Sequence, residues 1–142
     1  IRQFDIQSIS GLVFAFDEGW HEDEYDNATG LRWRWTSGRS VVRVIPPQAV
    51  RVTLRGESPL QYFPAPPTVR ISAGERVIAT RQPDSDFDWT IDVAAEEMLA
   101  SDGRIAIETD PVYLPGVVEG TADERQLGLR LFEMDVIPSR RD

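Results

Sequence analysis

Apolar and polar residues alternate along much of this chain, and the alternation is most regular between residues 86 and 93. There Phe87, Trp89, Ile91 and Val93 are separated by aspartates and a threonine. Successive side chains of a strand point to opposite faces, so this segment predicts a β-strand with one buried and one wet face. We expect further strands at 4–9, 12–16, 41–45, 50–54, 69–72, 76–80, 104–108 and 127–136.

Two local signals add detail to these strands. Ala73-Gly74-Glu75 predicts a tight turn, so the segments on either side of it form a β-hairpin. In the last strand the apolar positions run to Leu131 and then resume at Met134 and Val136. This change of phase predicts a β-bulge at 131–133.

Helical signals are scarce. Only residues 94–100 combine good helix formers, over about two turns. Long loops are expected at 59–67, which holds four prolines, and at 111–123. Together these patterns predict one all-β domain over residues 1–142, an antiparallel β-sandwich of jelly-roll, galactose-binding-like type with about nine strands and at most one short helix. An immunoglobulin sandwich fits less well, because the chain has no Cys–Trp–Cys framework.

The composition excludes several classes of function. The chain has no cysteine and all fifteen of its basic residues are arginine, so disulfides, thiolate metal sites and lysine chemistry are excluded. A net charge of −9 argues against binding to nucleic acid, which requires neutralisation of phosphates. No apolar run approaches the roughly 20 residues that span a bilayer. Because the chain starts at Ile1, we expect it to be a fragment of a longer protein.

The segment 20–35 holds three of the four tryptophans, the single histidine and four closely spaced acids. Aromatic rings stack on the C–H faces of sugars, while carboxylates and guanidiniums bind hydroxyl groups. The candidate ligand-binding residues are therefore Trp20, His21, Glu22 and Tyr25, with Trp20 in a polar loop as an exposed platform. Trp33 and Trp35 would share one face of a strand; we expect them to fill the core, with Arg32 and Arg34 facing water.

The acids and the single histidine also raise the question of a metal site or a catalytic site. Asp23, Glu24 and Asp26 offer the oxygen ligands that calcium prefers, although a solvated acidic loop explains the same pattern. Asp84, Asp86 and Asp88 resemble the opening of a calcium loop but lack the glycine at its sixth position, so Asp86 and Asp88 more simply form the wet side of the strand 86–93. A catalytic triad would have to use His21, and there is no G-x-S-x-G motif. Glu22 and Glu24 are too close in sequence to flank a glycosidic bond. We expect no catalytic residues and no required cofactor.

Several motifs resemble a β-sandwich domain of bacterial polytopic membrane proteins that are similar to membrane glycosyltransferases using lipid-linked sugars. They are Gly19-Trp20-His21 with the acids that follow, Gly30 to Trp35, Leu54-Arg55-Gly56, Phe87-Asp88-Trp89, Ile105 to Asp110 and Asp123 to Arg130. The resemblance covers about residues 16–136. It implies a C-terminal, extracytoplasmic domain of the cell envelope, tethered by a membrane segment that this chain lacks, with the catalytic acids in the membrane part.

The sequence therefore predicts a non-catalytic accessory module, carbohydrate-binding in character, attached to a membrane glycosyltransferase-like protein. Its partners would be a glycan or lipid-linked sugar acceptor and its own transmembrane domain, and not nucleic acid. The alternative is a protein-interaction or structural domain without a small-molecule ligand. In that case the contact would be the stiff loop 59–67, with Leu60, Tyr62 and Phe63 among the prolines.

Overall fold

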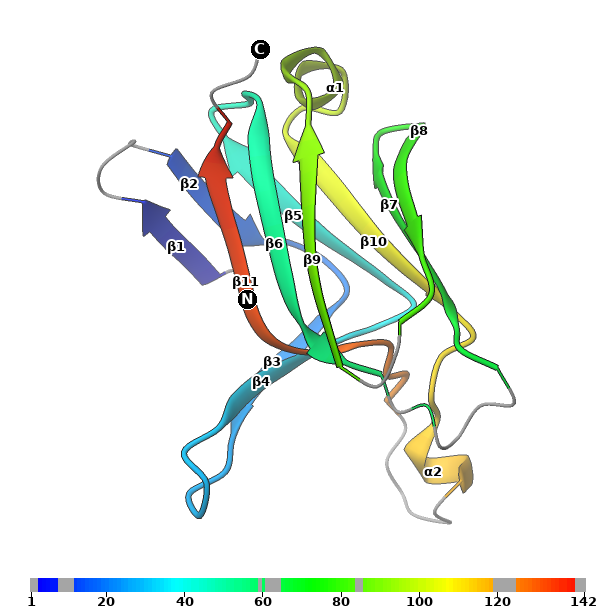
Figure 1. The fold of residues 1–142 in the computed structure, drawn as a ribbon. Helices are drawn as coiled ribbons and strands as arrows, with labels where there is room; N and C mark the ends of the chain where they lie inside the picture. Colours follow the sequence, from blue (N-terminus) through cyan, green and yellow to red (C-terminus); the bar gives the residue numbers. More distant parts are fainter. Residues whose placement is uncertain are drawn as a thin grey trace.

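Two antiparallel β-sheets face each other in the computed structural model, which describes residues 3–7, 12–58, 60, 65–83, 86–118 and 125–139 (Figure 1). The predicted β-sandwich is confirmed. The strands are β1 (Gln3–Gln7), β2 (Leu12–Phe16), β3 (Trp20–Tyr25), β4 (Arg32–Thr36), β5 (Arg39–Ile45), β6 (Val50–Glu57), β7 (Thr68–Ala73), β8 (Arg76–Arg81), β9 (Asp86–Val93), β10 (Arg104–Asp110) and β11 (Arg130–Pro138). The described residues thus form eleven strands where about nine were expected.

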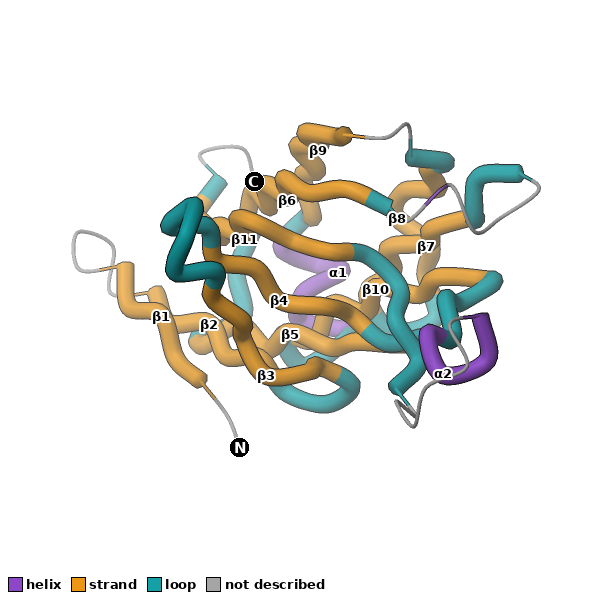
Figure 2. The backbone as a smooth tube through the Cα atoms, turned by 90° about the horizontal axis from the view of Figure 1, so that it is seen from below, coloured by secondary structure: helices purple, strands orange, loops and turns teal. Residues whose placement is uncertain are grey.

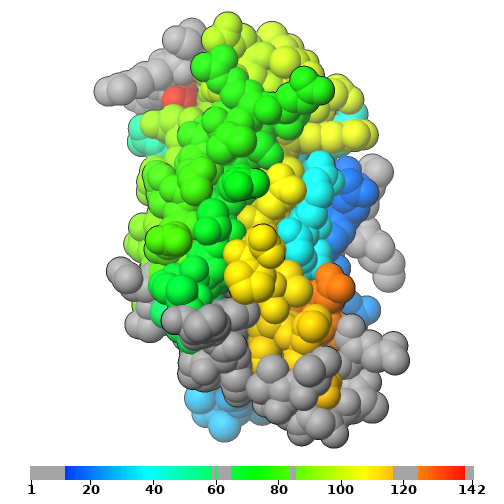
Figure 3. All heavy atoms as spheres, turned by 90° about the vertical axis from the view of Figure 1, so that its right-hand side faces the viewer, coloured from blue at the N-terminus to red at the C-terminus, as the bar shows by residue number. Residues whose placement is uncertain are grey.

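The strand pairing is that of a jelly roll. β7 pairs with β8, β6 with β9, β5 with β10 and β4 with β11, as in one long hairpin of eight strands. That hairpin is folded over so that β10 also pairs with β7 and β11 with β6, which closes two sheets. The sheet orders are β1-β2-β5-β10-β7-β8 and β3-β4-β11-β6-β9. Figure 3 shows the first sheet from outside, with β7–β8 green, β10 yellow, β5 cyan and β2 blue.

The core lies between the two sheets, and the period-two segments supply it. In β6 and β9 the buried positions alternate with exposed ones, as Val52 and Leu54 do with Arg51 and Arg55. Each large apolar side chain removed from water contributes about 1.5–3 kcal/mol. The largest side chains that are fully buried include Phe14, Leu12, Leu54, Ile71, Met98, Ile105, Ile107 and Leu129.

The outer face of the second sheet is covered by cross-strand ion pairs. Arg51 donates to Asp92 at 2.9 Å, and this hydrogen bond raises the pKa of the guanidinium. Arg55 lies between Asp88, at 3.7 Å, and Glu133, at 3.1 Å. Exposed pairs of this kind add little stability. Asp86 and Asp88 are exposed on this face, as expected, whereas Asp84 lies outside the described residues.

The expected helix is confirmed as α1 (Ala95–Ala100), where Glu97 accepts a hydrogen bond from the Ala94 backbone N–H and Met98 enters the core. A second helix, α2 (Pro115–Val118), was not expected; it is one turn within the long link after β10. Neither of these described helices has the length and apolar character needed to span a bilayer.

The predicted bulge and hairpin are also confirmed. The register of β11 against β6 shifts between Leu131 and Glu133, which leaves Phe132 as the extra residue. The turn at Gly74–Glu75 joins β7 and β8. β4 pairs with β11 only through Arg34 and Trp35, immediately before the bulge. Beyond that point β3 and β4 leave the sandwich as a hairpin, which we call the arm (Figure 1).

Candidate functional site

The arm contains the aromatic and acidic segment that the sequence singles out. Residues 20–25 were expected to be a loop, but they form β3, which pairs with β4 as an edge strand (Figure 2). The prediction failed because acids occupy both faces of this strand, so no apolar alternation marks it. At the tip, Asp26 and Gly30 close the turn: the Gly30 N–H donates to the Asp26 carbonyl, and Gly30 has a φ of +74°.

A bulge in β3 decides which side chains face inward. Trp20 lies opposite Thr36 and Asp23 lies opposite Arg34, so β3 has one residue more than β4 between these pairs. Directly opposed residues share a face of the sheet. The inner face of the arm therefore carries Trp20, Asp23 and Tyr25 from β3, with Arg32 and Arg34 from β4.

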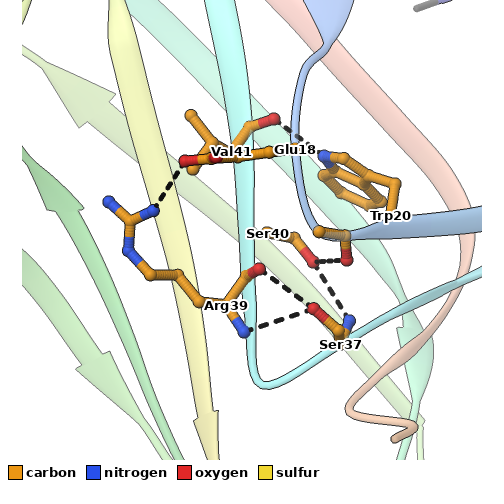
Figure 4. A network of polar contacts seen from close by, with 7 residues as sticks. Glu18, Trp20, Ser37, Arg39, Ser40 and Val41 are labelled. Carbon is orange, nitrogen blue, oxygen red and sulfur yellow. Dashed lines mark hydrogen bonds and ion pairs between the residues drawn. The ribbon is translucent and has the colours of Figure 1, made fainter. Parts of the chain in front are cut away.

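Trp20 is anchored at the root of the arm (Figure 4). Its indole Nε1–H donates to the Val41 carbonyl at 2.8 Å, and its ring meets Phe16 edge-on with 4.8 Å between centroids. The preceding Gly19 has a φ of +84°, and a Cβ there would overlap the Arg39 carbonyl. The close approach of the segment before β3 to the start of β5 therefore requires glycine. Trp20 is thus a half-buried wall of the site rather than the exposed platform that was expected.

Arg34 is the main departure from the predicted site. Its side chain is only 13% exposed, and its guanidinium carbon lies 4.6 Å from the centre of the Phe16 ring. It also donates to the His21 carbonyl at 2.8 Å and lies 3.8 Å from Asp23. The prediction that Trp33 and Trp35 fill the core is wrong, because both lie half-buried on the outer face, away from the core cluster.

Two adjoining hollows open on the inner face of the arm. The first, of about 330 Å³, lies at the fork where β4 leaves β11 and is bordered by Arg32, Trp33 and residues 131–134. The second, of about 400 Å³, lies at the root of β3 beside Gly19. We call the two hollows together the trough, because they share four lining residues: Phe16, Trp20, Asp23 and Arg34.

Three of the four candidate ligand-binding residues gather in the second hollow, which Trp20, His21 and Glu22 all border. The His21 ring binds the Gln126 backbone carbonyl at 2.9 Å, which ties the arm to the segment before β11. Tyr25 lies farther out on the arm and is 54% exposed. Sequence reasoning missed Phe16, because it ends an ordinary apolar strand and gives no separate signal.

The acids considered as metal ligands do not converge. Asp23 and Glu24 point to opposite faces of β3; Glu24 accepts a hydrogen bond from Trp33 Nε1 at 3.1 Å and lies 3.5 Å from Arg125. The Asp26 carboxylate accepts from the Ala28 N–H at the turn. Within the described ranges, no group of three or more His, Cys, Asp or Glu side chains could hold a metal ion.

The outer face of the arm carries a second aromatic group. The Arg130 guanidinium lies between two rings, 4.4 Å from the centre of Trp33 and 5.0 Å from that of Phe132, and pairs with Glu57 at 3.4 Å. Of the loop residues in the alternative interpretation, Leu60 is half-buried, while Tyr62 and Phe63 lie outside the described residues.

Comparisons with family models, with curated protein sequences and with solved structures gave no match for this chain.

Proposed function

We propose that this domain is a non-catalytic carbohydrate-binding module whose site is the trough on the inner face of the arm. The observation that carries the proposal is the convergence of Phe16, Trp20, Asp23 and Arg34 on both hollows. Two aromatic rings, a carboxylate and a guanidinium are the groups that a pyranose ring needs for stacking and for hydrogen bonds to its hydroxyls.

The trough is built on strands and not on mobile loops, which favours binding. The Val41 carbonyl fixes Trp20, and the His21 carbonyl fixes Arg34. Fixed side chains lose little conformational entropy when a ligand binds. The Asp23 side chain is half exposed, so its oxygens remain accessible to hydroxyl groups. An open trough buries little of its ligand, so we expect millimolar to micromolar affinity.

His21 borders the second hollow, and its ring contacts the Gln126 backbone carbonyl at 2.9 Å, which fixes the ring beside the site. A module of this kind would hold a glycan, or the acceptor of a lipid-linked sugar, for a membrane-bound glycosyltransferase-like part of the same protein. The motif resemblance supports this context and an extracytoplasmic location in the cell envelope.

A glycan array followed by isothermal titration of the hits tests the proposal on the 142-residue chain. We expect Asp23→Ala to weaken binding about tenfold, the value of a hydrogen bond to a charged group. Trp20→Phe should weaken it as well. The matched controls are Asp86→Ala and Trp89→Phe, both on β9 and away from the trough. Asp86 is an exposed acid, and the Trp89 ring stacks on Phe87 with 4.1 Å between the ring centroids.

Both tryptophan variants need a melting curve, because each ring packs against the core. Asp23→Ala needs the same check, because the half-exposed Asp23 carboxylate lies 3.8 Å from the largely buried Arg34. A blank array, or affinities that Asp23→Ala and Trp20→Phe leave unchanged, would disprove the proposed function.

A further inference from the structure

Among the described residues, the charges around the first hollow leave one cation without an acidic partner. Two acids and two arginines border this hollow. Asp23 lies 3.8 Å from Arg34, and Glu133 lies 3.1 Å from Arg55 on the neighbouring strand. The remaining residue is Arg32, which forms no ion pair within the part of the chain that the structure describes.

The position of Arg32 is nevertheless defined by an aromatic contact. It lies opposite Tyr25 in the β3–β4 ladder, and its guanidinium carbon is 5.2 Å from the centre of the Tyr25 ring. Stacking occupies the flat face of a guanidinium and leaves the N–H groups along its edge free. Those N–H groups form a fork that matches the two oxygens of a carboxylate. Arg32 is exposed at the border of the hollow, so a ligand reaches it.

The Arg32 cation lies in a chain with a net charge of −9, which repels anions in general. A neutral sugar would gain little from it. We propose that the trough prefers a carboxylate-bearing sugar, a uronate, and that Arg32 is the residue that determines this preference. Tyr25 then acts by positioning Arg32. The inference rests on the proposed function and adds the chemical class of the ligand.

A matched pair of ligands isolates the carboxylate. Titration of the 142-residue chain with trigalacturonate and with its methyl ester compares one ring shape with and without the charge. We expect the acid to bind about tenfold more tightly than the ester, and this preference to fall as salt is raised. A phosphorylated hexose is the third ligand, because phosphate also binds arginine.

Arg32→Gln should remove the preference, so that the acid and the ester bind this variant equally. Arg32→Lys keeps the charge without the planar fork and should retain only part of the preference. Tyr25→Leu should also reduce it, since the guanidinium loses its support. Arg70→Gln, at an exposed arginine on the outer face of the other sheet, is the matched control and should change nothing.

The outcomes separate the two proposals. If acid and ester bind equally, or if the preference survives Arg32→Gln, the uronate inference is wrong and the carbohydrate site stands. Tighter binding of the phosphorylated hexose than of the uronate would also overturn it. If no sugar binds at all, both proposals fall.

Discussion

The guanidinium of Arg34 lies over the ring of Phe16, with 4.6 Å between the guanidinium carbon and the ring centre. Arg34 belongs to β4 in one sheet and Phe16 to β2 in the other. The contact therefore joins the two sheets at the root of the arm. It also shapes the trough, since both side chains border both hollows.

A double-mutant cycle should detect this contact as a coupling energy. Arg34→Met and Phe16→Leu each keep apolar volume while removing one partner. We expect a coupling of about 0.5–2 kcal/mol between them, because the guanidinium is largely withdrawn from water. Urea unfolding of the wild type, the two single variants and the double variant measures it.

The matching cycle pairs Arg34→Met with Phe87→Leu. Phe87 lies on β9, three strands from β4, or about 14 Å at the usual strand spacing. Its coupling to Arg34 should be within about 0.5 kcal/mol of zero. Equal coupling in the two cycles would show that Arg34 supports the sheet in general and not through Phe16.

The same substitution, threonine to valine, should change the free energy of unfolding differently at two buried threonines. The Thr36 hydroxyl accepts a hydrogen bond from the Leu129 N–H at 2.8 Å, whereas the buried Thr109 hydroxyl has no hydrogen-bond partner among the described residues. Thr36→Val would leave a buried N–H unsatisfied, so we expect a loss of about 1–3 kcal/mol in the free energy of unfolding. Thr109→Val should cost nothing or stabilise. Chemical denaturation of both variants checks this, and equal losses would contradict it.

Much of the sandwich could be predicted because its central strands bury one face each. The alternation around Phe87 and Trp89 follows from that burial, and so does the phase change after Leu131, where the bulge restores the buried face. The same reasoning fails where a strand has no buried face over its whole length. β3 carries acids on both sides, so nothing in its pattern distinguishes it from a loop.

The sequence pattern predicted the wrong face of β4 as the buried one, and the reason is physical. Tryptophan usually points inward and arginine outward, yet in this fold Thr36 fixes the register by its bonds to the segment 128–129, and Arg34 follows it onto the inner face. A guanidinium can be placed there because Phe16, Asp23 and the His21 carbonyl surround it. These contacts compensate for placing the Arg34 charge on the inner face. They come from residues distant in sequence, so the pattern of residues along β4 gives no sign of them.

The bulge at Phe132 offers a test of how the fork forms. Leu131 and Glu133 pair with Gly56 and Arg55, which are consecutive residues of β6. Deleting Phe132 would make Leu131 and Glu133 consecutive as well, so the pairing of β11 with β6 continues unchanged.

We therefore expect the deletion variant to fold, with an unfolding free energy within about 2 kcal/mol of the wild type, because Phe132 is exposed and outside the core. Without the bulge β11 loses its local bend, β4 can pair beyond Arg34, and the hollow between them narrows. Amide hydrogen exchange should then show new protection at Arg32, the next residue of β4 after Arg34 whose N–H faces β11, and titration should show loss of the proposed glycan binding. Deletion of Thr53 from β6 is the control: it would turn Leu54 outward and Arg55 into the core, and should prevent folding. A folded Phe132 deletion with no new protection at Arg32 would show that the arm leaves the sheet for a reason other than the bulge.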